Sequence, residues 1–271
     1  MNKHKYFILI CLTWAYLFWG LIVLSGISAK SIYGIILIIM GGLSPFIATL
    51  MLLFRYEDKH TRSDFVKNIF NIRSIKKRYF YFIIFIPLLI LHLSILTTYF
   101  LSQIFPFINV KEIVIVHEVI SSSFLSILTF ALIVLIAGPI PEEIGWRGYL
   151  LPNLLKKFTL LKSSIIIATV WGIWHLPLFL IKDYPLSDKL SNLFELIVYF
   201  AQLYPKAIIY SILFIKTKRS IFMAIMFHFF INFYGMIFEI NTITQYFELT
   251  LWSILAYYAY AEIKKNSKYL V

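Results

Sequence analysis

The chain has 271 residues, of which 61% are hydrophobic and 14% charged, and its formal net charge is +12 at pH 7. Soluble globular domains are roughly half apolar, so this composition excludes an ordinary soluble domain and indicates a protein that lies in a lipid bilayer. The one cysteine, Cys11, excludes an internal disulfide.

Apolar runs follow one another along the whole chain. A spanning helix needs roughly 20 mainly apolar residues, and we predict eight of them in an all-α, polytopic membrane helix bundle that forms a single domain over residues 1–271. The first run follows a basic start like that of a signal peptide, but its length favours an uncleaved span; cleavage would leave seven spans. The expected spans are residues 6–25, 32–54, 79–101, 122–137, 163–181, 193–215, 221–240 and 246–262.

The basic residues predict the orientation in the membrane. Most of the 25 Lys and Arg residues fall in the two terminal segments and in alternate loops, and cytoplasmic loops collect such residues. We therefore expect both termini in the cytoplasm. The net positive charge is thus explained by loops that face the lipid bilayer, which is the expected partner. We expect no nucleic-acid partner. The basic loop 55–78 also carries apolar residues, and we expect it to lie along the anionic inner leaflet.

The stretch GPIPEEIGWRGYL, residues 138–150, places charges directly after the fourth span. The fourth span is expected to end at the prolines, and Pro141 is suited to begin a new helix, which we expect to run along the inner membrane surface. Glu143 and Arg147 are four residues apart and can form an ion pair. Glu142 points about 100° away and is left available as a general base. The alternative is a helix cap with a surface salt bridge.

Two later spans carry polar side chains that lipid penalises, which makes these side chains functional candidates. His175 follows Trp171 by four residues in the fifth span, and His228 and Asn232 are four residues apart on one face of the seventh. A single histidine among aromatic residues is more often a structural core residue. The His–Asn pair is harder to explain in that way, because asparagine is also costly in lipid.

A polar stripe follows the sixth span. Its members are Glu195, Tyr199, Gln202 and Lys206, at spacings of four, three and four residues. We expect a hydrogen-bonded seam between helices there, and the alternative is a lining for the substrate cavity.

Three motifs in this order resemble the CPBP family of intramembrane proteases. The motifs are Glu-Glu-x-x-x-Arg at residues 142–147, an aromatic residue and His at 171–175, and His-x-x-x-Asn at 228–232. That family comprises the type II CAAX prenyl endopeptidases and their bacterial relatives, including bacteriocin-immunity proteins. The resemblance covers residues 141–234 and implies a catalytic core over residues 122–240. The family usually has Phe where this chain has Trp171.

The resemblance implies a catalytic set of six residues: Glu142, Glu143, Arg147, His175, His228 and Asn232. Within it, Glu142 with His175 would activate the attacking water. His228 and Asn232 would polarise the scissile carbonyl and stabilise its oxyanion. The remaining Glu and Arg would orient the site.

We expect the site to need no metal or other cofactor. The alternative is a Zn²⁺ ion held by Glu142, His175 and His228 with an open position for water. Against zinc, the chain has no His-Glu-x-x-His helix, and Asn232 suits an oxyanion better than a metal.

The function we expect is an intramembrane endopeptidase that hydrolyses a peptide bond near the cytoplasmic leaflet. Its substrate would be a peptide or a membrane protein, and its place a bacterial plasma membrane, since the heavy use of Ile, Lys, Phe and Tyr is typical of AT-rich bacterial genomes. One alternative is a non-catalytic bacteriocin-immunity or scaffold protein of the same fold. A proton-coupled transporter is disfavoured, because the titratable groups cluster toward one side of the membrane.

Overall fold

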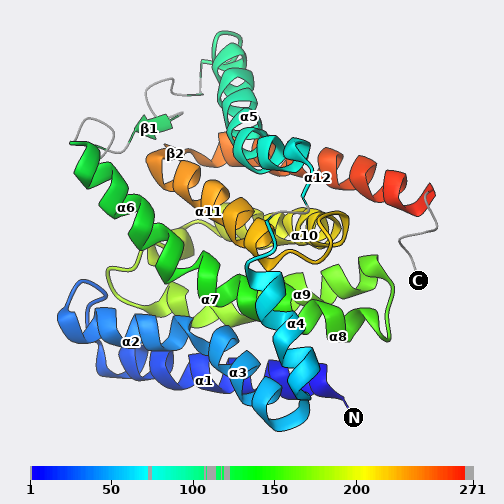
Figure 1. The fold of residues 1–271 in the computed structure, drawn as a ribbon. Helices are drawn as coiled ribbons and strands as arrows, with labels where there is room; N and C mark the ends of the chain where they lie inside the picture. Colours follow the sequence, from blue (N-terminus) through cyan, green and yellow to red (C-terminus); the bar gives the residue numbers. More distant parts are fainter. Residues whose placement is uncertain are drawn as a thin grey trace.

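The computed structural model describes residues 2–72, 75–106, 108, 114–116, 118 and 123–265, and helices dominate it (Figure 1). The predicted all-α class is confirmed. The described residues add one short antiparallel ribbon, in which β1 (Val114–Val116) pairs with β2 (Phe238–Ile240). The α-helices are α1 (Lys3–Ser25), α2 (Ile32–Gly42), α3 (Ser44–Tyr56), α4 (Lys59–Ile69), α5 (Lys77–Ser102), α6 (Phe124–Ala137), α7 (Pro139–Glu143), α8 (Leu151–Leu155), α9 (Leu160–His175), α10 (Leu193–Lys216), α11 (Ile221–Ile237) and α12 (Thr242–Lys265).

Three shorter helical turns complete the described elements. A π-helical turn, η3 (Ile144–Leu150), joins α7 to α8. Two 3₁₀ turns, η4 (Leu176–Leu180) and η5 (Ser187–Ser191), lie between α9 and α10.

The chain is a multi-pass membrane protein. Helices lie in all eight predicted ranges, of which the fourth begins at residue 122, outside the described residues. By length and composition, five helices of the described chain can cross a membrane, or up to six if the bent pair α2–α3 is one span. The seventh predicted range holds α11, an apolar helix of 17 residues. How many of the eight cross the bilayer stays a prediction.

Helix α1 illustrates how the bundle is built for lipid. Phe7, Cys11, Ala15 and Trp19 repeat every four residues, and each is exposed by 1% or less, so they form one stripe against the core. The opposite face is apolar too, with Leu24 exposed by 88%. A helix that is apolar all round lies in lipid rather than at a water-exposed surface.

The helices that carry the predicted site meet at the centre of the bundle. Helices α7 and α9 lie between the layer of α1–α3 and the layer that contains α11 (Figure 1). Helix α7 contacts α3, α6 and α11, and α10 packs against α9, α11 and α12.

Two expectations about the stretch after the fourth span are wrong. The helix that carries the two glutamates begins at Pro139, not at Pro141, because both prolines fit its first turn, where no amide donor is needed. The segment that follows is not a surface helix. Trp146, Arg147 and Leu150 are completely buried, because η3 packs against α3, α4 and α11.

Candidate active site

The two predicted acids lie at the start of the buried segment. Helix α6 ends before Gly138, and Glu142 falls in the first turn of α7, where the helix dipole favours a negative charge. Glu142 is exposed by 6% and Glu143 not at all. The helix cap with a surface salt bridge, the alternative for this stretch, is therefore wrong: these carboxylates lie in the interior.

The Glu143 carboxylate is bound by two side chains, a guanidinium and an imidazole. Arg147 Nη1 donates to Glu143 Oε1 at 2.8 Å, and neither side chain has exposed surface. The predicted ion pair is confirmed. His228 Nδ1 lies 2.9 Å from the same oxygen, and because the carboxylate accepts, this nitrogen carries the proton. The bond from α11 was not predicted, since sequence spacing relates residues only within one helix.

The guanidinium of Arg147 lies between aromatic rings. Its carbon is 4.1 Å from the ring centroid of Tyr210 on α10 and 5.1 Å from that of Trp171 on α9. Such cation–π contacts stabilise a desolvated cation by about 2 kcal/mol. Sequence reasoning missed Tyr210, which has no motif around it and is exposed by 1%.

The spacing predicted that the Glu142 carboxylate has no partner. In the structure one of its oxygens accepts a hydrogen bond, and the other oxygen remains available. The indole Nε1 of Trp171 donates to Glu142 Oε2 at 2.7 Å. The other oxygen faces Gly138, whose missing side chain would lie 3.4 Å from Glu142 Oε1 and 3.7 Å from Asn232 Nδ2. Gly138 thus leaves room where the free carboxylate oxygen and the amide converge.

The two remaining polar residues reach the same region from other helices. His175 ends α9 and is half-buried, and its Nδ1 donates to the carbonyl of Trp171 at 2.8 Å. Its Nε2 is therefore the acceptor in the neutral ring. Asn232 is half-buried one turn after His228 on α11. All six predicted residues thus belong to elements that meet around α7, and their roles in the chemistry stay predictions.

The alternative zinc set does not fit this geometry. Within the described chain, no group of three or more His, Cys, Asp or Glu side chains could hold a metal ion.

As expected, the polar stripe on α10 mainly forms a hydrogen-bonded seam with the neighbouring helix α12. Lys206 Nζ donates to Gln202 Oε1 at 2.5 Å and lies 3.5 Å from a Glu248 oxygen of α12, and Thr242 donates to Glu195 at 2.8 Å. Tyr199 differs, because its ring lies 5.8 Å from that of His175.

One more aromatic residue near the site was missed. Tyr184 lies in the loop between η4 and η5, and burial together with the negative charge of nearby Glu142 raises the pKa of its phenol to about 12. The residue lies in a loop rather than on a periodic helix face, so no sequence pattern marks it.

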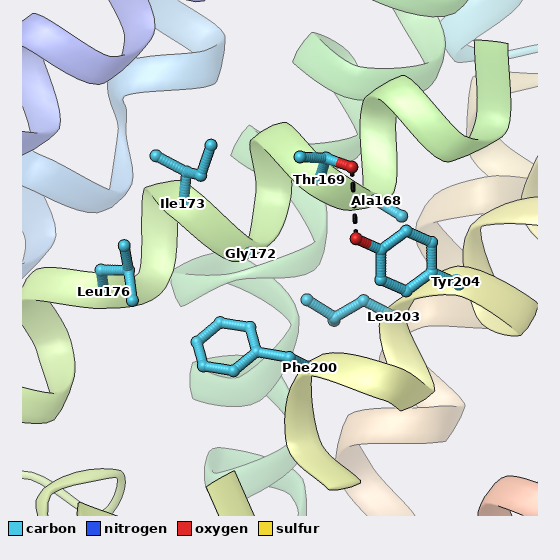
Figure 2. Close-up of a pocket in the computed structure, with 8 residues that line it drawn as sticks. All are labelled: Ala168, Thr169, Gly172, Ile173, Leu176, Phe200, Leu203 and Tyr204. Carbon is cyan, nitrogen blue, oxygen red and sulfur yellow. Dashed lines mark hydrogen bonds between the residues drawn. The ribbon is translucent and has the colours of Figure 1, made fainter. Parts of the chain in front are cut away.

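A groove of about 290 Å³ lies on another side of α9. Figure 2 shows Phe200, Leu203 and Tyr204 of α10 facing Gly172, and a bond of 3.3 Å between the hydroxyls of Thr169 and Tyr204. None of the six predicted site residues lines it. The groove is mainly apolar and opens between two helices that can cross a membrane by length and composition.

Comparison with known proteins points to one family. Residues 124–234 match the family described as type II CAAX prenyl endopeptidase Rce1-like. A curated protein named CAAX prenyl protease 2, from Methanococcus maripaludis, is 28% identical over 214 residues, which cover 76% of this chain and 74% of that protein. The matched region contains all three motifs in their order. The resemblance to the type II CAAX prenyl endopeptidases, first indicated by the three motifs, is confirmed by both comparisons.

Proposed function

We propose that the chain is an intramembrane endopeptidase whose attacking water is activated by Glu142 and His175. The observation that carries this proposal is the convergence of a free carboxylate oxygen of Glu142 and the amide of Asn232 beside Gly138. A buried carboxylate with one oxygen held and the other open is suited to take a proton from water. His175 Nε2 is free to accept a second hydrogen bond from the same water.

The other half of the site is suited to the oxyanion. Asn232 offers amide N–H donors. His228 holds its Nδ1 proton on the Glu143 carboxylate and would donate to the oxyanion from Nε2 in the form in which that nitrogen is also protonated. Donors that point at the developing charge contribute roughly 3–4 kcal/mol each in proteases. After attack, the proton taken by Glu142 passes to the leaving amine, which frees the carboxylate again.

We place this chemistry near the cytoplasmic leaflet of a bacterial plasma membrane, within a catalytic core over residues 122–240 of the single domain. The substrate class is a peptide or membrane protein, and no cofactor is needed. The relative from Methanococcus maripaludis is named for prenylated CAAX substrates. A peptide whose farnesylated cysteine is followed by three C-terminal residues is therefore the first defined probe.

The test compares cells that express the wild type with cells that express Glu142→Ala at matched protein level. Cellular and secreted peptides are profiled by mass spectrometry, and the farnesylated probe is added to isolated membranes. We expect new peptide termini with the wild type alone.

The matched control is Glu248→Gln. Glu248 also accepts an indole N–H, from Trp252 at 2.9 Å, but it lies on α12 in the seam with Lys206. This variant should keep the wild-type peptide profile. Identical profiles for the wild type and Glu142→Ala would refute the protease proposal. A deletion phenotype that Glu142→Ala still rescues would then favour the immunity or scaffold role.

A further inference from the structure

One residue of α9, Trp171, contacts four of the six predicted site residues through its side chain and its carbonyl. The indole N–H of Trp171 donates to Glu142 Oε2 at 2.7 Å. Its ring lies 5.1 Å from the guanidinium carbon of Arg147 and meets the ring of His228 edge to face at 5.5 Å. Its carbonyl accepts the Nδ1 proton of His175 at 2.8 Å.

These contacts decide which atoms remain open for a reaction. The indole holds one oxygen of Glu142 and leaves the other toward Gly138. The carbonyl keeps the proton of His175 on Nδ1 and leaves Nε2 as the acceptor. Trp171 is exposed by 5% and has two side-chain torsions, so packing fixes its ring and therefore the carboxylate.

A hydrogen bond to the carboxylate is also favourable energetically. Bonds to an ionised acceptor are shorter and stronger than neutral ones, and the short distance of 2.7 Å fits such a bond. Phenylalanine at this position would keep an aromatic ring against Arg147 and His228. It could not donate to Glu142, because it has no polar atom.

We propose that Trp171 is a positioning residue of the protease site, which orients the Glu142 carboxylate through its indole N–H. This inference rests on the proposed function above. The indole affects the reaction only through Glu142 and does not contact the substrate. The expected signature is a loss in kcat with little change in KM, since binding of the peptide does not depend on the carboxylate orientation.

The variant that tests it is Trp171→Phe, which removes the N–H and keeps an aromatic ring. The matched control is Trp252→Phe. Trp252 is exposed by 1% and donates to Glu248 Oε1 at 2.9 Å, so the same kind of indole–carboxylate bond is lost in the seam of α12 instead of at Glu142. Wild type, both Phe variants and Glu142→Ala are compared by the peptide profile in cells. Purified proteins then yield kcat and KM on the peptide so found, together with melting temperatures.

We expect kcat of Trp171→Phe to fall about tenfold with KM within about twofold, as for the loss of a hydrogen bond to a charged group. Trp252→Phe should keep the wild-type kcat, and the two Phe variants should melt at similar temperatures. An unchanged kcat in Trp171→Phe overturns the positioning role while the protease activity stands. An equal loss of kcat in both variants also overturns it, because the effect is then one of general packing. If the wild type and Glu142→Ala produce the same peptides, the proposed function fails and the role of Trp171 fails with it.

Discussion

At the scale of single residues, the buried charge of Arg147 shows how this site is stabilised. The side chain has no exposed surface, and its partners are the Glu143 carboxylate at 2.8 Å and the rings of Trp171 and Tyr210. A buried charge without a partner is strongly unfavourable. The same contacts therefore stabilise the fold and orient the groups around Glu142.

Replacing this arginine should destabilise the protein strongly. In Arg147→Met the carboxylate of Glu143 stays buried without its cation, and breaking a buried pair in this way costs about 3–5 kcal/mol. We expect a lower melting temperature in detergent, measured by intrinsic fluorescence. The control is Lys67→Met, which removes an exposed pair with Asp64 and should cost at most about 1 kcal/mol. Equal melting temperatures for the two variants would contradict the argument.

At the scale of elements, the π-helical turn η3 determines how closely the site segment approaches α3. A side chain on Gly145 would lie 2.4 Å from Pro45 Cβ and 2.8 Å from the Pro45 carbonyl oxygen. Such distances are shorter than any normal contact, so glycine is needed at this crossing. The close approach brings the turn that carries Arg147 into the interior.

We therefore expect Gly145→Ala to force η3 and α3 apart. Overpacking of this kind costs about 1–3 kcal/mol, and the melting temperature should fall accordingly. Gly20→Ala on α1 is the matched control, because nothing lies within 4 Å of the added atom. There a helical glycine is replaced without a clash, which should stabilise by about 0.5–1 kcal/mol. A melting temperature for Gly145→Ala at or above that of the wild type would rule out this packing argument.

At the scale of the whole molecule, contacts between loops support the predicted alternation of loops between two sides of the bundle. Segments expected in the cytoplasm touch one another: Lys3 pairs with Glu57 at 2.8 Å, and Ser220 donates to the carbonyl of Asn71 at 2.7 Å. Segments expected outside also meet, since Ala29 N donates to the carbonyl of Lys182 at 2.9 Å. Both sets of contacts support a bundle in which successive loops alternate between two sides.

Labelling of single cysteines tests the orientation. In a Cys11→Ala background, Lys30→Cys should react with a membrane-impermeant maleimide on spheroplasts, because the loop after α1 is expected outside. Lys67→Cys on α4 should react after permeabilisation alone. Cys11→Ala without an added cysteine is the unlabelled control. The reverse pattern would place both termini outside the cytoplasm.

The sequence by itself determined the helices and the membrane class, and it singled out six polar residues whose elements the fold brings together around α7. Apolar runs of about 20 residues predict spans because lipid offers backbone groups no other partners. The spacing of Glu143 and Arg147 predicted their ion pair, since residues four apart share a helix face. Helix bounds were less accurate, as at Pro139, because two nearby prolines suit a helix start equally well.

Only the tertiary structure decided how the groups of different helices pair. The bond from His228 to Glu143, the indole donor of Trp171 and the ring of Tyr210 over Arg147 each join two helices. No spacing along one helix encodes such contacts. The burial of η3 was also beyond the sequence, because a stretch with charges and prolines resembles a surface loop until α3 and α11 pack over it. The chain thus specifies its polar groups locally, and the packing of the bundle decides which of them meet.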